Sequence, residues 1–590
     1  MQQLILFCTL GAIACTGGKE PSEPATEPAM PSESGNPIDT GDTEPPAPAE
    51  YMMMDPVNSL TRISLALRGI RPSKDEILAV RDDPSLVESY ALEYTNSPEF
   101  GLTIRDMYAE QLRMRALDLI LPNLGVLEDI SNIDLQHALA EEPLALIEQV
   151  VLSEQPFTTI VTADWSVLNE TSSLIWGSHT YDFSQGGEQT VNWTDGRPAA
   201  GILSTSSMLL KHDSTGANYH RGRTNTLTDV LLCAPFAGRD IPLTGDIDLS
   251  DDEAVATAVN TQTECIGCHQ ALDPLAAHYW VFRARLSPFQ VNTAYGSDFN
   301  CANLPPQFSC YPVEMYAPSY ADRWMSLGLR PPNYWGASTT DMGDVGQLIA
   351  EDPRFSLCAA ERFSSYLTQK DADQISFERI AELQQLFIDG NFNAKQLAYE
   401  IVTDPAFLAL DATPEAVADD LPGIQIIRPE QLDRMFSDLT GLEWTYFINR
   451  NNIGDIKVLL NDSIGFRAMA GGVDGVNVTY PTHTPTPIKL LVLAAYAEEA
   501  AGYVVEEDFA LPANERTLLT LVEPSLTSEA PIRQQISILY AKILGVQTAT
   551  DSEDVDAAWD LFSQFSQEDP ELAWKTLIAA MLQSPEILFY

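Results

Sequence analysis

Apolar side chains recur at intervals of three and four residues through most of the chain after residue 57. The spacing is seen at Leu60, Ile63, Leu67 and Ile70, and again at Leu432, Met435, Phe436 and Leu439. Residues three or four apart lie on one face of an α-helix, so this spacing is typical of helices that bury one side. The chain is therefore predicted to be mainly α-helical.

Two short patterns recur along the chain. The first runs from apolar and Arg positions to a glycine that suits a helix end, at 60–69, 432–441 and, more loosely, 533–545. The second places Pro directly behind a Ser or Asp cap, as in Ser97-Pro98, Asp404-Pro405 and Ser584-Pro585. Their recurrence predicts an internal helical repeat.

The chain opens with an apolar run from Leu4 to Ala14 that ends at Cys15. Such a run is shorter than the ~20 residues that a spanning helix needs, but it fits the core of a secretory signal. Residues 12–15, Ala-Ile-Ala-Cys, resemble the bacterial lipobox, whose cysteine becomes the lipid-modified N-terminus. We expect residues 1–15 to be a lipoprotein signal peptide, with an ordinary cleaved signal peptide as the alternative.

Residues 16–56 are rich in Pro, Glu, Ser and Thr. A segment of this composition buries too little apolar surface to offset its conformational entropy. It is predicted to be a disordered tether. With a lipid on Cys15, the protein would be exported and anchored in the outer membrane or at the cell surface.

The charge of the chain excludes one class of partner. It carries 84 acidic and 33 basic residues, for a formal net charge of -51. Nucleic acid is therefore not expected to bind, because its phosphates would be repelled. The acidity favours solubility in a salty medium.

Residues 265–269 read Cys-Ile-Gly-Cys-His. Two thiols at this spacing can add to the vinyl groups of a haem, and the adjacent imidazole can bind the iron. Cys265 and Cys268 are thus predicted to attach one c-type haem covalently, with His269 as its proximal iron ligand. A disulfide between the two cysteines and half of a zinc site are the alternatives.

The sequence does not single out one distal ligand for that iron. Thioether candidates are Met208 and Met315, whereas His212 or His220 would give a bis-histidine site. An iron without a distal protein ligand is the remaining alternative.

Four further cysteines are available for disulfides in an oxidising compartment. The short loop between Cys301 and Cys310 is the easiest to close, which would leave Cys233 to pair with Cys358.

The motif and its surroundings resemble a known family. The run from Cys265 to Leu275, which includes Asp273-Pro274-Leu275, is similar to the haem motif of the planctomycete-type cytochrome-associated multi-module proteins. Residues 200–203, 220–223 and 231–233 look like the approach to that motif, and residues 355–407 look like the small helical module that follows it. The resemblance implies export and a cytochrome-like module; it does not imply a substrate.

These patterns together predict a mainly α protein of several helical modules with an embedded, loop-rich cytochrome c-like haem module. The predicted parts are a signal peptide at 1–15, a tether at 16–56, a helical domain at 57–195, the haem module at 196–340, a small helical module at 341–412 and a repeat-like helical domain at 413–590.

The function expected from this organisation is single-electron transfer with a redox partner protein that the sequence does not identify. A haem peroxidase-like enzyme with an open iron and a non-catalytic surface binding or structural protein are the two alternatives.

Overall fold

Many helices of this protein begin at a side chain that accepts hydrogen bonds from the first backbone amides. Asp55 accepts from the amides of Val57 and Asn58 at 3.0 and 3.1 Å, and Ser97 accepts from that of Phe100 at 3.2 Å. These caps satisfy donors that have no partner inside the helix. The predicted Ser-Pro start at residue 98 thus begins a helix.

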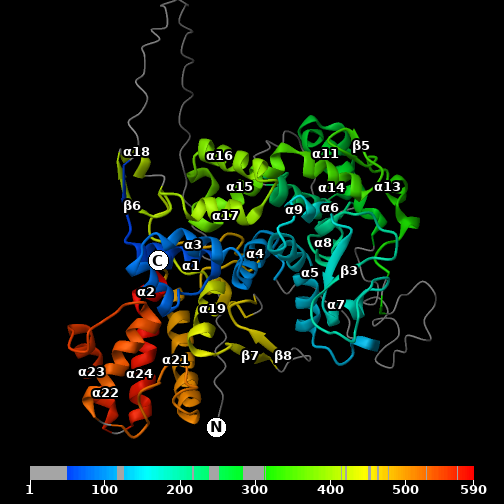
Figure 1. Ribbon diagram of the computed structural model, residues 1–590. Helices are drawn as coiled ribbons and strands as arrows, with labels where there is room; N and C mark the ends of the chain where they lie inside the picture. The colour runs from blue at the N-terminus through cyan, green and yellow to red at the C-terminus, as the bar shows by residue number, and fades with distance from the viewer. Residues whose placement is uncertain are drawn as a thin grey trace, which may run out of the picture. The chain divides into compact units, whose positions relative to one another are not determined.

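The computed structural model describes residues 50–115, 125–214, 218–237, 251–282, 311–312, 314–413, 415–418, 421–448, 454–461, 464–475, 477–526, 528–567 and 569–590. The described part is mainly helical, as predicted, with small antiparallel strand pairs (Figure 1).

The first helices and strands, up to residue 232, are β1 (Glu50–Met53), α1 (Pro56–Arg68), α2 (Lys74–Asp82), α3 (Leu86–Tyr94), α4 (Pro98–Gln111), α5 (Asn132–Leu152), α6 (Thr159–Thr162), β2 (Trp165–Leu168), α7 (Glu170–Ile175), β3 (Gln189–Asn192), η2 (Gly201–Ser204), α8 (Ser206–Leu210) and α9 (Arg221–Leu232).

The middle of the chain contains α10 (Asp252–Thr261), α11 (Thr263–Ala277), η3 (His278–Val281), α13 (Arg323–Ser326), β4 (Asn333–Tyr334), β5 (Ala337–Ser338), α14 (Met342–Glu351), α15 (Pro353–Thr368), α16 (Phe377–Asp389), α17 (Ala394–Val402), β6 (Ala409–Thr413) and α18 (Glu415–Ala418).

The C-terminal part contains α19 (Pro429–Thr440), β7 (Thr445–Ile448), β8 (Gly454–Lys457), α20 (Phe466–Met469), α21 (Pro487–Ala510), α22 (Glu529–Leu539), η7 (Tyr540–Leu544), α23 (Glu553–Ser566), α24 (Pro570–Leu582) and α25 (Pro585–Leu588).

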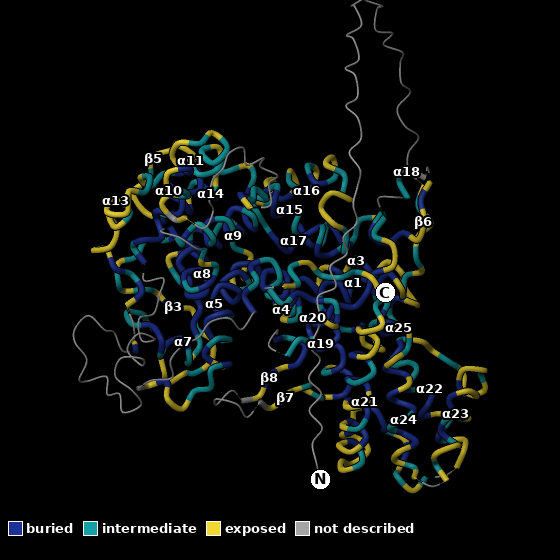
Figure 2. Tube along the Cα trace, turned by 180° about the vertical axis from the view of Figure 1, so that it is seen from behind, coloured by how far each residue is buried: buried dark blue, intermediate teal, exposed yellow. Residues whose placement is uncertain are grey.

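The buried apolar side chains form two large clusters. One extends from Leu60 to Leu408 and includes most of the length of α5, which is buried (Figure 2). The other contains Leu65 and residues from Ile426 to Leu588, where α21, α22, α23 and α24 pack together. The predicted parts 57–195, 196–340 and 341–412 therefore contribute to one shared core.

Strand β1 corrects the predicted end of the tether. Residues 50–53 were expected to belong to it, but they pair antiparallel with β6, with Glu50 opposite Thr413 and Tyr51 opposite Ala412. Backbone hydrogen bonds to a strand that lies about 360 residues later in the chain order this segment. The signal peptide, Cys15 and the tether up to residue 49 lie outside the described residues.

Helices α1 and α19, which carry the predicted repeat, end alike and lie against each other. Each ends at a glycine in the left-handed conformation, Gly69 at φ 69° and Gly441 at φ 78°. Gln431 donates to the carbonyl of Leu65, and Arg434 Nε donates to that of Arg68. The backbone carbonyls at the end of α1 thus find their partners on α19.

Buried ion pairs join α4 to α19. Asp106 is 3% exposed and binds Arg115 at 2.5 Å and also Arg434. Glu110, one turn further along α4, pairs with Arg428 at 3.0 Å, directly before α19. Burial alone would raise the pKa of Asp106, but the two guanidinium groups outweigh it and hold that pKa below its usual value.

Within the described residues, no helix is long and apolar enough to cross a membrane.

Replacing the central carboxylate of this interface should be costly. Asp106→Ala would leave two guanidinium groups without their buried partner, so we expect the free energy of unfolding to fall by ~3–5 kcal/mol. Urea denaturation measures this loss. Asp82→Ala is the control, because the Asp82 side chain is 79% exposed and its loss should change stability by less than about 0.5 kcal/mol. Equal stability of the two variants would contradict the prediction.

Asp433 predicts a specific pH dependence. Burial raises its pKa from 3.8 to about 6, against the opposing charges of Lys457 and Arg434. The folded protein then binds more protons than the unfolded chain between these two values, so this residue lowers stability as pH rises through that window.

The Asp433→Asn variant should therefore be as stable as wild type near pH 4 and more stable at pH 7, by at most about 3 kcal/mol. Denaturation at both pH values, with the exposed Asp560→Asn as control, tests this. A difference between variant and wild type that does not change with pH would refute it.

Candidate functional site

The three residues of the predicted haem motif lie on one helix, α11. Cys265, Cys268 and His269 are separated by three and four residues, so they share one side of that helix. All three are partly exposed, and neither Cys265 nor Cys268 is bonded to another of the described cysteines. The motif therefore presents two thiols and an imidazole together.

The imidazole of His269 is held by a buried carboxylate one turn further along the helix. Nδ1 of His269 lies 3.1 Å from Oδ1 of Asp273, whose side chain is 4% exposed. When Nδ1 carries the proton, it donates to Asp273, and the lone pair of Nε2 is left for a metal. This arrangement fixes both the tautomer and the orientation of the ring.

Asp273 is in turn held by Arg221 at the start of α9. Nε and Nη2 of Arg221 donate to its two oxygens at 2.5 and 3.0 Å. Burial raises the pKa of Asp273, but the hydrogen bonds from His269 and Arg221 outweigh it, so that pKa lies below its usual value. Asp273 is thus a carboxylate at neutral pH and an acceptor for His269.

A cavity of about 460 Å³ lies beside the motif helix. Gly267 and Ala271 of α11 line it, and so do Phe236, Trp335 and Arg354. The two aromatic rings face each other with centroids 6.1 Å apart and planes 16° apart, and Arg354 lies over the indole at 4.4 Å. The cavity thus has both aromatic and polar walls. The α11 residues that line it lie on the side of the helix away from Cys265, Cys268 and His269.

The two predicted thioether ligands lie in the main core. Met208 is 1% exposed on α8, which packs against α5, whereas α11 packs against α9 and α10. Met315 is fully buried, and Arg197 Nη1 lies 3.5 Å from its sulfur. Both are core residues in this structure, and the distal side of the predicted haem stays a prediction.

Of the two predicted histidine alternatives, His220 is buried and His212 is partly buried. His220 stacks on Tyr279 with centroids 5.8 Å apart, and its Nδ1 lies 2.8 Å from Arg223. Burial lowers the pKa of His212 to about 3. Each ring is packed among protein groups.

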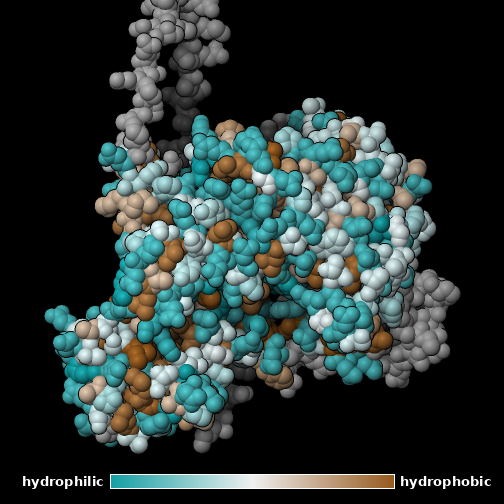
Figure 3. All heavy atoms as spheres, in the orientation of Figure 1, coloured by the Kyte–Doolittle hydropathy of each residue, from teal (hydrophilic) through white to brown (hydrophobic). Residues whose placement is uncertain are grey.

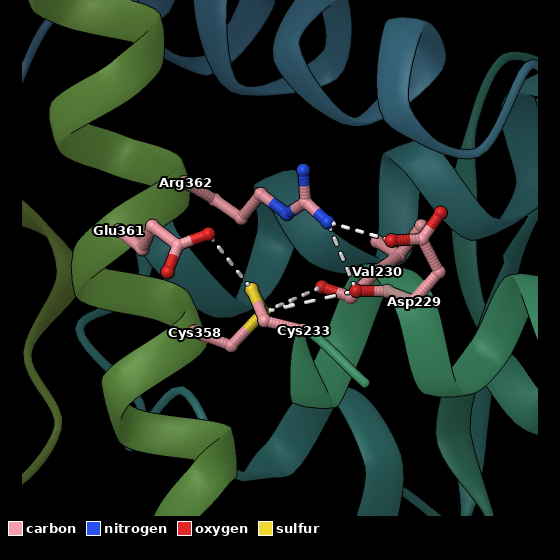
Figure 4. The surroundings of a disulfide bond; sticks show 6 residues. All are labelled: Asp229, Val230, Cys233, Cys358, Glu361 and Arg362. Atoms are coloured by element: carbon pink, nitrogen blue, oxygen red, sulfur yellow. Dashed lines mark hydrogen bonds and ion pairs between the residues drawn. A yellow bond between two sulfur atoms is a disulfide. The ribbon is translucent and has the colours of Figure 1, made fainter. Parts of the chain in front are cut away.

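The structure brings Cys233 and Cys358 together as a disulfide with a Cα–Cα distance of 5.3 Å (Figure 4). Cys233 follows the last turn of α9, and Cys358 lies on α15. Next to the bond, Arg362 of α15 donates to the carboxylate of Asp229 on α9 at 2.9 Å. The bond and the ion pair fasten α9 to α15. Cys301 and Cys310 lie outside the described residues.

Three features of this site were not predicted from the sequence. Arg221 binds Asp273, and the cavity is lined by Trp335 and Arg354, which lie 66 and 85 residues beyond His269 in the chain. The Asp-Pro-Leu after the motif was the one available signal, since it places Asp273 four residues after His269. No spacing rule links α11 to Trp335.

Within the described ranges, no group of three or more His, Cys, Asp or Glu side chains is arranged to hold a metal ion. Comparisons with protein-family models, with curated proteins and with solved structures find no match to this chain.

Removing the disulfide should destabilise the protein. The bond closes a loop of 125 residues, so Cys233→Ser/Cys358→Ser is expected to lower the free energy of unfolding by ~2–5 kcal/mol. Denaturation of the oxidised proteins measures this. Mass spectrometry after alkylation without reduction provides the check, because finding alkylated Cys233 and Cys358 in wild-type protein produced in an oxidising compartment would contradict the bond.

Proposed function

We propose that this protein is an exported lipoprotein that carries one covalent c-type haem on Cys265 and Cys268 and transfers single electrons. His269 is its proximal iron ligand. The observation that carries the proposal is the chain of contacts from Arg221 through Asp273 to His269, which leaves one imidazole nitrogen for a metal.

The residues present fit such a group. The two thiols and the imidazole stand together on one partly exposed side of α11. When bound, a haem supplies an iron that changes its oxidation state by one electron. Asp273 would orient the ligand ring and raise its basicity.

Export is part of the same proposal. Covalent haem attachment of this type takes place outside the cytoplasm, and the predicted lipoprotein signal with Cys15 supports that location. The resemblance of residues 265–275 to the planctomycete-type cytochrome-associated family supports it further. The membrane would be reached through the lipid, and the redox partner would be a protein of unspecified identity.

The decisive experiment is an absorption spectrum of the full chain, produced in a periplasm that matures c-type haem. We expect a Soret band that stays with the denatured polypeptide. Cys268→Ser should lose the double attachment, whereas the control Cys233→Ser/Cys358→Ser should keep it. A wild-type protein without covalent pigment would refute the proposal, and a high-spin spectrum would favour the peroxidase-like alternative.

Asp273→Asn tests the role of the buried carboxylate. Without its negative charge the ligand imidazole is less basic, so the oxidised iron is less stabilised and the midpoint potential should rise. Redox titration against the exposed control Asp373→Asn measures the shift. An unchanged potential in a folded, haem-loaded Asp273→Asn protein would show that Asp273 has only a structural role.

A further inference from the structure

A second cavity, of about 380 Å³, is lined by residues that are distant in the chain from the haem motif. It is formed by the start of α1, by the end of η7 and by the C-terminal residues, and its apolar lining includes Met54, Val57, Leu410, Ile424 and Leu544. Its volume falls in the range of small-molecule sites, which are mostly apolar with a few polar groups that orient the ligand. The polar groups of its wall therefore indicate which ligand it suits.

The guanidinium of Arg71 lines this cavity and is only partly satisfied. Arg71 is 9% exposed; its Nη1 donates to the carbonyl of Leu544 at 3.1 Å and its Nη2 to that of Glu586. Nε of Arg71 has no hydrogen-bond partner among the described residues. Burial lowers the pKa of Arg71 to about 10, against the opposing effect of the charge of Glu586.

No ion pair with a carboxylate is formed by Arg71 in the described part of the chain. The carboxylate of Glu586 is instead bonded to the hydroxyl of Ser584. Glu586 also lines the cavity and its charge acts on Arg71. Without a direct ion pair, however, the lost hydration of the buried guanidinium is replaced only in part. In a chain with 84 acidic residues, the lack of a direct ion pair here is a property of the site and not of the composition.

A second buried guanidinium stands next to the same cavity. Arg62 is 1% exposed; it donates to Gln425 Oε1 at 3.2 Å and to the carbonyl of Gly423, which lines the cavity. Its described partners are likewise neutral. The buried arginines between α4 and α19 form ion pairs with carboxylates, whereas Arg62 and Arg71 form none with the described residues.

Apolar side chains surround the opening. Leu410 is 61% exposed and Ile424 is 80% exposed, and both line the cavity. Figure 3 shows hydrophobic side chains on the surface over β1 and β6, beside this position. Gly545, at φ 72°, also lines the cavity, and a Cβ there would lie 3.3 Å from Nη1 of Arg71. The absence of a side chain at Gly545 leaves room beside the guanidinium.

We propose that this cavity binds an amphipathic monoanion, a carboxylate with an alkyl chain. The carboxylate lies against Arg71 as a charge-assisted hydrogen-bond acceptor, and the alkyl chain lies along Val57, Leu410 and Ile424. This site does not depend on haem attachment, so the test of either proposal leaves the other one unaffected.

Calorimetric titration of the full chain with decanoate tests the proposal. Decyl maltoside and decyltrimethylammonium provide the same alkyl chain with a neutral and a cationic head. We expect saturable binding of one decanoate, with at least tenfold weaker binding of the other two. Absence of decanoate binding, or equal affinity for all three, would overturn the proposal.

Variants locate the ligand. Arg71→Met should weaken decanoate binding at least tenfold, and Thr61→Phe should do the same by filling the cavity while Arg71 stays in place. Arg81→Met is the matched control, since Arg81 is exposed on α2 and should not affect binding. If Arg71→Met does not fold, Arg71→Lys and Thr61→Phe still test whether decanoate binds in this cavity. Wild-type affinity in folded Thr61→Phe would place the ligand elsewhere and overturn the assignment.

Discussion

Asp106 joins the two halves of the described fold. Its carboxylate lies between Arg115, next to its own helix, and Arg434 on α19, and each half has its own apolar core. A buried carboxylate is tolerated only when opposite charges and hydrogen bonds replace its hydration. The relative position of α4 and α19 is therefore fixed by directional contacts, and the packing of α1 on α19 follows from it.

The candidate haem site depends on a similar constraint at α9. Its first residue, Arg221, holds Asp273 on α11, and the residue after its last turn, Cys233, is bonded to Cys358 on α15. One helix thus connects the motif to the rest of the core at both of its ends. The orientation of His269 is in this way linked to the packing of helices that carry no part of the motif.

The sequence predicted the local elements well where the signal was local. The spacing of apolar residues indicated helices, and the left-handed glycines at Gly69 and Gly441 end α1 and α19 as predicted. The predicted end of the tether was wrong, because residues 50–53 pair with β6, a strand far away in the chain. Composition describes a segment's own tendency and contains no information about a distant strand that pairs with it.

The same difference between local and distant contacts applies to the two cavities. The sequence by itself determined the mainly helical class and the five-residue motif from which haem attachment is proposed, since both depend on residues close together in the chain. Only the tertiary structure decided that Arg221 holds Asp273, that Trp335 lies near the motif helix, and that Arg71 is buried without an ion pair to a described carboxylate. These contacts join residues from 52 to more than 500 positions apart, and their formation depends on how the helices pack.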